Sequence, residues 1–96
     1  MKEEKLVPIS TLCVHYEVEM AFFSELNEYG LIEIDTQEQT ECIRVECIPE
    51  IEKMIRIHRD LRVNMEGIDV VWNLLQKMDE LQNELMAVRS RLRLYE

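Results

Sequence analysis

The chain has 96 residues, of which 47% are hydrophobic and 32% charged, and its net charge at pH 7 is −9. Residues 1–52 contain 13 Asp and Glu against 3 Lys and Arg, a net of −10, whereas residues 53–96 have a net of +1. Affinity for duplex DNA comes largely from Lys and Arg that displace counterions from phosphates. The acidic first half therefore argues against nucleic-acid binding and favours a basic protein surface as partner.

The sequence also argues against a membrane or secreted protein. No apolar run approaches the roughly 18 residues that cross a bilayer, and the first ten residues lack the apolar core of a signal peptide. The three cysteines are an odd number, and their spacing fits no metal-binding pattern. We therefore expect a cytoplasmic protein with reduced thiols and no membrane segment.

The first predicted elements are two short helices joined by a turn. Residues 5–8 are expected to be extended, because Pro8 fixes the backbone at their end. Ser10 is a favoured N-cap and predicts a helix at about 11–16. After a turn at 15–19, which lacks the usual glycine, a second helix is expected at 20–29. Gly30 follows it, and glycine adopts the left-handed backbone of a helix end with least strain.

A hairpin and a third helix are expected next. Two β-prone runs, residues 31–34 and 42–45, flank a polar stretch at 35–41, which is typical of a β-hairpin. Pro49 opens the third helix, since proline in the first turn has no N–H that needs a partner. The inward stripe of this helix is predicted to contain Ile51, Met54 or Ile55, His58, and Leu61 or Arg62.

The last predicted element is a long helix over residues 65–94, capped by Asn64. Its apolar residues recur at steps of three and four, which indicates the seam of a coiled coil. They are Ile68, Val71, Leu75, Met78, Leu81, Leu85, Val88, Leu92 and Tyr95. Trp72 is predicted to pack between this helix and the third helix. Residues 80–94 extend beyond what the rest of the chain can cover, so we expect a homodimer through Leu81, Leu85, Val88 and Leu92. The charged positions beside the seam leave parallel and antiparallel pairing open.

The fold class predicted from these elements is mainly α, with a small β-hairpin and a long C-terminal coiled-coil helix. The order of elements resembles the MerR-like winged helix-turn-helix family. The residues that carry the resemblance are Ile9-Ser10-Thr11-Leu12, Val18, Tyr29-Gly30-Leu31-Ile32 and the junction at 58–68. The resemblance implies a winged helix-turn-helix-like domain at residues 1–64 and a dimerisation helix at 65–96 that pairs in an antiparallel arrangement.

Within that family, the chain is most similar to the CbpM-like chaperone-modulator branch. Its phrases L-x-P-I-S-T-L-C-x-H-Y at 6–16 and E-L-N-E-Y-G-L-I-E at 25–33 carry the similarity. DNA-binding relatives usually have an Arg-Tyr-Tyr-like cluster in the second helix, where this chain has Ser24, Glu25 and Leu26. The resemblance implies binding to the J-domain of a DnaJ-like co-chaperone and inhibition of its stimulation of Hsp70. A divergent MerR-like DNA-binding transcriptional regulator and an interaction protein with another partner are the alternatives.

Four glutamates around the second helix are the candidate partner-binding residues: Glu17, Glu19, Glu25 and Glu28. The competing interpretation is an ordinary solvated polar face. A second acidic face, around Glu66, Asp69 and Asn73, is the alternative site on the same argument. On the third helix, Arg56, Arg59 and Arg62 could contact phosphates, but three arginines without a basic recognition helix are too few for specific DNA binding.

Metal binding and catalysis have little support in the sequence. Structural zinc needs four converging ligands with short paired spacings, which Cys13, His15, Cys42, Cys47 and His58 do not provide. There is no Gly-rich loop, nucleophile motif or acid/base dyad. We therefore expect no metal, no cofactor and no enzymatic activity.

Overall fold

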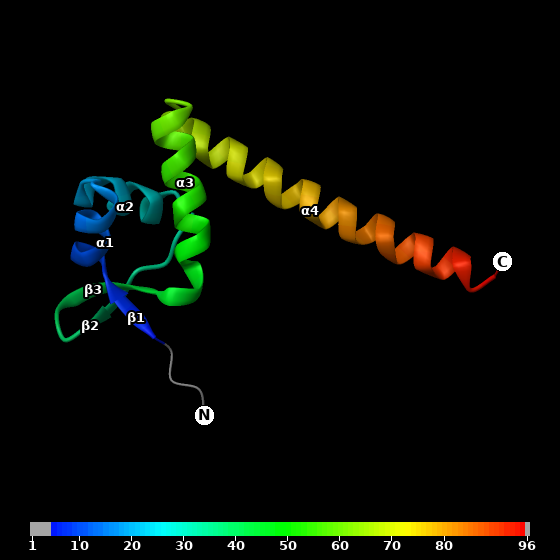
Figure 1. The fold of residues 1–96 in the computed structure, drawn as a ribbon, viewed down its shortest axis with the longest axis horizontal. Helices are drawn as coiled ribbons and strands as arrows, with labels where there is room; N and C mark the ends of the chain where they lie inside the picture. Colours follow the sequence, from blue (N-terminus) through cyan, green and yellow to red (C-terminus); the bar gives the residue numbers. More distant parts are fainter. Residues whose placement is uncertain (1–4, 96) are drawn as a thin grey trace.

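The computed structural model describes residues 5–95, and Figure 1 shows a small body of helices and strands from which one long helix projects. The elements in chain order are β1 (Leu6–Pro8), α1 (Ile9–Tyr16), α2 (Met20–Glu28), β2 (Asp35–Gln37), β3 (Thr40–Arg44), the 3-10 turn η1 (Val45–Cys47), α3 (Ile48–Asp60) and α4 (Met65–Arg93). This order confirms the mainly α winged helix-turn-helix architecture. Residues 1–4 and 96, at the outer ends of the two predicted domains, lie outside the described residues, and the division at residue 64 stays a prediction.

The first helix begins earlier than predicted. β1 runs directly into α1, so that Pro8 occupies the N-cap position and Ile9 is the first helical residue. No side chain caps this helix, and the prediction that Ser10 does so is wrong. The reason is tertiary: Pro8 is held opposite Cys42 in the sheet, and Ile9 is only 1% exposed in the core. Together these two contacts fix the start of the helix upstream of Ser10.

The C-terminal ends of α1 and α2 are both closed by backbone hydrogen bonds. At the end of α2, Gly30 has a φ of +74°; its N–H donates to Asn27, and that of Leu31 donates to Leu26. This is a Schellman motif, and it confirms the predicted stop at Gly30. At the end of α1 the left-handed position is occupied by Glu17, with φ 56° and ψ 48°. A non-glycine residue is strained there, so other contacts must hold it.

The predicted hairpin forms; β3 overlaps the second predicted strand at 42–45, but the first strand lies farther along the chain than predicted. β2 pairs antiparallel with β3, with Asp35 opposite Cys42 and Gln37 opposite Thr40. Glu38 and Gln39 make a two-residue turn in which both φ angles are positive. The backbone twist of such a turn matches the right-handed twist of the strands that it joins. The prediction of a strand at residues 31–34 is wrong. Ile32 of this segment is buried in the core, and residues 31–34 do not pair with β3. The strand that does pair begins with the polar residues that follow, at Asp35.

The sheet and helices enclose one apolar core. β3 is the central strand, in the order β1-β3-β2, and its Ile43 is fully buried. The core consists of Ile9, Leu12, Phe22, Phe23, Leu26, Ile32, Ile43, Ile51, Met54, Ile55, Met65 and Ile68, with Trp72 packed against it. The inward stripe of α3 therefore stops at Ile55. His58 and Arg62 are exposed and Leu61 is 69% exposed, so the predicted extension of the stripe to these positions is wrong.

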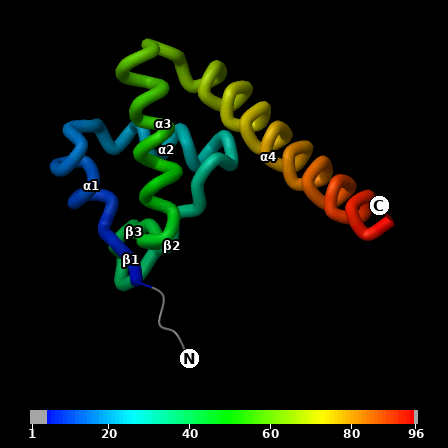
Figure 2. Tube along the Cα trace, turned by 45° about the vertical axis from the view of Figure 1, so that its right-hand side comes forward, coloured from blue at the N-terminus to red at the C-terminus, as the bar shows by residue number. Residues whose placement is uncertain are grey.

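α4 starts in the core and then leaves the body. The side chain of Asn64 accepts a hydrogen bond of 2.8 Å from the Gly67 N–H, which confirms the predicted cap. Met65 and Ile68 are buried, whereas every residue from 73 to 95 is exposed. Figures 1 and 2 show α4 running away from the body in both views. Neither α4 nor any other helix among residues 5–95 has the apolar length needed to cross a membrane.

The Asn64 cap should stabilise the fold measurably. Asn64→Ala removes the acceptor for the Gly67 N–H, and loss of an N-cap typically lowers the free energy of unfolding by about 1 kcal/mol. Urea denaturation followed by circular dichroism measures this change. Asn83→Ala, in the exposed part of α4, is the matched control and should cause no loss, because alanine is the better helix former. Equal unfolding midpoints for the two variants would contradict the role of the cap.

Candidate functional site

The four predicted glutamates lie along one strip of the surface. Glu17 and Glu19 belong to the turn between α1 and α2, Glu25 and Glu28 lie on α2, and all four are exposed. Glu17, Glu19 and Glu25 line one shallow groove, whereas Glu25 and Glu28 line the next. Because both grooves share Glu25, the strip is continuous. We call these four residues the acidic strip, and their role in binding stays a prediction.

The first groove has an apolar floor beneath its carboxylates. Val18, Ala21 and Phe22 line it together with His58 and Arg59 from α3. Phe22 is only 7% exposed and Phe23 is fully buried, so both are core residues and neither is available as a binding anchor. The His58 ring lies 5.0 Å from the Phe22 ring, measured between centroids, and closes one side of the groove. Three carboxylates and the Arg59 guanidinium therefore line this groove, with little exposed aromatic surface.

Arg59 was not expected at this site. Its Nη2 donates to the backbone carbonyl oxygens of Tyr16 and Glu17, the latter at 2.6 Å. These carbonyls end α1 and have no partner within the helix. The only hint in the sequence is that the turn lacks a glycine, which leaves its left-handed residue in need of support. Because the guanidinium faces the turn, the interpretation of Arg59 as a phosphate contact loses its basis.

The second groove joins α2 to the start of α4. It is lined by Glu25, Glu28, Tyr29, Asn64, Met65 and Glu66. Partial burial raises the pKa of Tyr29, and the negative charges of Glu66, Asp69, Glu25 and Glu28 raise it further. The carboxylates of both helices therefore act on one hydroxyl. The acidic strip and the alternative face at Glu66 and Asp69 meet at Tyr29, which is 40% exposed and is the accessible aromatic side chain of this surface.

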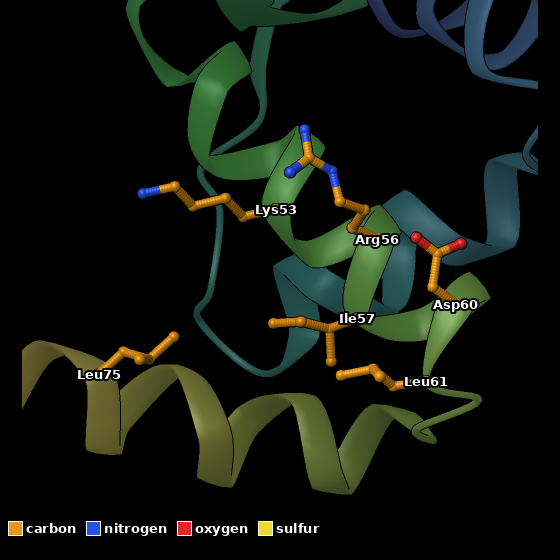
Figure 3. Close-up of a pocket in the computed structure, with 6 residues that line it drawn as sticks. All are labelled: Lys53, Arg56, Ile57, Asp60, Leu61 and Leu75. Atoms are coloured by element: carbon orange, nitrogen blue, oxygen red, sulfur yellow. The ribbon is translucent and has the colours of Figure 1, made fainter.

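A groove of different polarity lies in the angle between α3 and α4. Figure 3 shows Ile57 of α3 and Leu61, the residue after α3, on the side of α4, and Leu75 of α4 lines the same groove. Lys53, Arg56 and Asp60 complete its lining. Leu75 also belongs to the apolar seam of α4. The groove is thus continuous with that seam and separate from the acidic strip.

The four predicted dimerisation residues form an exposed apolar row on α4. Leu81, Leu85, Val88 and Leu92 are 44–63% exposed. Between residues 79 and 93 of the same helix, the acidic residues precede the basic ones. Asp79, Glu80 and Glu84 come first, and Arg89, Arg91 and Arg93 follow. Burial of each leucine or valine side chain of this row against a partner would contribute about 1.5–3 kcal/mol.

The residues considered for zinc do not converge. Among residues 5–95, no group of three or more His, Cys, Asp and Glu side chains could hold a metal ion. Cys13, Cys42 and Cys47 are free thiols, and Cys42 is buried. His58 is engaged elsewhere, because its Nδ1 lies 2.9 Å from the Val63 carbonyl oxygen and donates to it.

Comparison with known proteins finds similarity over most of the chain. Residues 7–90 match the family described as MerR HTH family regulatory protein. A relative from Pseudomonas entomophila (strain L48), named chaperone modulatory protein CbpM, is 24% identical over 83 residues, which cover 85% of this chain and 82% of the relative. Relatives of the same name from Pseudomonas putida, strains KT2440 and W619, are 25% and 24% identical with the same coverage.

The junction of the two acidic faces can be tested at Tyr29. Glu66→Gln removes a negative charge that disfavours the phenolate, so the pKa of Tyr29 should fall toward its ordinary value. NMR titration of the tyrosine ring carbons measures this pKa. Glu80→Gln, farther along α4, removes the same charge and should leave the Tyr29 titration unchanged. If both variants titrate like the unmodified protein, Glu66 does not act on Tyr29.

Proposed function

The chain belongs to the family of MerR HTH regulatory proteins, and we propose that it acts as a non-enzymatic chaperone modulator rather than as a DNA-binding regulator. In this proposal it binds the J-domain of a DnaJ-like co-chaperone and inhibits the stimulation of Hsp70 by that co-chaperone. The name shared by relatives in Pseudomonas, chaperone modulatory protein, supports the first part. The resemblance of residues 6–16 and 25–33 to the chaperone-modulator branch supports the second.

The observation that carries the proposal is the acidic strip on the helix-turn-helix. A helix-turn-helix protein reads DNA with its second helix, which enters the major groove. In this chain the corresponding helix, α2, presents Glu25 and Glu28 to solvent, and the turn before it presents Glu17 and Glu19. Phosphates would be repelled by such a surface. We therefore propose that the surface used for DNA elsewhere in the family binds a basic protein here.

A J-domain has the chemistry that this surface would attract. J-domains approach Hsp70 with a basic helix, and complementary charge speeds encounter and selects the partner. Affinity usually depends on a few aromatic or arginine anchors near the centre of an interface. Tyr29 lies between the glutamates of α2 and Glu66 of α4, so it is our candidate anchor. A competitor that covers the basic helix would block its access to Hsp70.

We propose further that the protein is a homodimer through α4, with an antiparallel arrangement. The exposed seam at Leu81, Leu85, Val88 and Leu92 supports pairing with a second copy. The resemblance to the MerR-like family favours the antiparallel arrangement.

Neutralising the acidic strip should weaken partner binding without unfolding the protein. With Glu17, Glu19, Glu25 and Glu28 all replaced by Gln, we expect association with the J-domain to slow on the order of tenfold and to lose much of its salt dependence. Exposed charge changes usually alter stability by less than about 0.5 kcal/mol each. Surface plasmon resonance over a salt series measures the rates, and an Hsp70 ATPase assay should show relief of inhibition.

The matched control removes the same charge elsewhere. Glu38, Glu41, Glu46 and Glu50 are also exposed, on the hairpin and at the start of α3. Their replacement by Gln changes the net charge equally, and it should alter association far less because these residues lie off the strip. If both quadruple variants slow association with the J-domain equally, net charge alone is the cause, and the proposed contact surface is refuted.

The dimer is tested by placing a charge in the seam. Leu85→Asp or Leu92→Asp would bury an unpaired carboxylate between the helices and should give a monomer at tens of micromolar. Size-exclusion chromatography with light scattering measures the mass. Met86→Asp is the control, because Met86 is equally accessible on α4 but lies outside the seam. An unmodified protein that is itself monomeric at these concentrations would overturn the proposal.

A further inference from the structure

We propose that Arg59 positions the turn glutamates of the acidic strip for the partner, an inference that rests on the proposed function. Arg59 lies on α3, more than 40 residues beyond the turn in the sequence. Its guanidinium donates to the backbone oxygens of Tyr16 and Glu17 at the end of α1. It therefore joins α3 to the turn that carries Glu17 and Glu19.

The turn needs this support because of its backbone conformation. Glu17 has φ 56° and ψ 48°, a left-handed conformation that side-chain-bearing residues rarely adopt. Within the turn, Val18 donates a 3.1 Å hydrogen bond to the Cys13 carbonyl. The Glu17 N–H donates to the same carbonyl. Backbone bonds of this kind usually close a helix end where glycine supplies the left-handed residue. With glutamate in place of glycine, the charged donor of Arg59 supplies the additional interaction that keeps the turn closed.

The position of the turn decides where two of the four glutamates lie. Glu17 is the left-handed residue itself, and Glu19 is the N-cap of α2, two residues later. Both share a groove with Arg59 and with Glu25. Among residues 5–95, the ion pairs shorter than 4 Å are those of Arg44, so Arg59 makes none with these carboxylates. Its hydrogen bonds to backbone oxygens hold the turn and leave the glutamate side chains free for a basic partner.

The positioning role and a simple charge effect predict opposite changes in partner affinity when Arg59 is removed. Arg59 carries the same charge as the proposed partner, so electrostatics alone predicts that removing it strengthens binding. Positioning predicts that removing it weakens binding. Arg59→Lys separates the two effects further. Lysine keeps the charge, but its Nζ lies one bond nearer the backbone than the Nη2 that reaches both carbonyls. Electrostatics predicts no change for that variant, whereas positioning predicts a loss.

The experiment compares Arg59→Gln, Arg59→Lys and the control Arg56→Gln in the full chain. Arg56 lies on the same helix but lines the groove between α3 and α4. The first readout is hydrogen exchange of the Val18 amide, and the second is affinity for the J-domain of the DnaJ-like co-chaperone of the same organism. Both Arg59 variants should speed Val18 exchange and weaken affinity by about tenfold, the effect of losing a hydrogen bond from a charged donor. Arg56→Gln should leave exchange unchanged and bind as tightly as the unmodified protein or more tightly.

The outcomes separate this inference from the proposed function. Unchanged or tighter J-domain binding by both Arg59 variants overturns the positioning role. So does unchanged exchange at Val18. If the unmodified protein does not bind the J-domain, the proposed function fails, and the exchange data still decide whether Arg59 holds the turn. A variant with both Arg59→Lys and Glu17→Gly adds a rescue test. Glycine adopts the left-handed backbone without strain, so Val18 protection should return, and persistent fast exchange would count against the inference.

Discussion

Contacts at the C-terminal turn of α3 hold three parts of the molecule in place. Arg59 donates to the end of α1, and His58 donates to the Val63 carbonyl in the segment that leads into α4. One turn earlier, Met54 and Ile55 are buried in the core. The helix-turn-helix, the core and the start of α4 therefore share one rigid support. The position of the acidic strip relative to α4 follows from this arrangement.

The course of α4 gives the protein two surfaces of different character. Its first turns pack into the core through Met65 and Ile68, which brings Glu66 and Asp69 beside Tyr29. Beyond Trp72 the body no longer covers the helix, and an apolar seam is exposed. Charge dominates the first surface and hydrophobic area the second. In our proposal, a basic partner binds the first surface and a second copy binds along α4.

The acidic strip also explains how a helix-turn-helix fold is compatible with a role other than DNA binding. The core residues of α1 and α2 are apolar and inward, so they maintain the scaffold regardless of what the outer face carries. The exposed positions can change sign at little cost in stability, because surface charges contribute weakly to folding. Function on this scaffold is therefore determined by the outer side chains, and the fold alone does not specify it.

The sequence by itself determined the features whose causes are local. Gly30 ends α2 and Asn64 begins α4, because each acts on backbone groups a few residues away. The regular spacing of apolar residues predicted where the helices lie. The count of charged residues showed that residues 1–52 are acidic. It also identified the four glutamates as candidates, and the structure shows all of them exposed on adjoining grooves.

Only the tertiary structure decided the features that depend on distant contacts. Ser10 has the chemistry of a cap, but the pairing of Pro8 with Cys42 starts the helix before it. The β-prone residues 31–34 lost their strand because Ile32 is required in the core. Arg59 reaches the turn across more than 40 residues, and Tyr29 meets Glu66 from another helix. Such contacts depend on how complete elements pack, and local patterns carry no information about partners so far away in the chain.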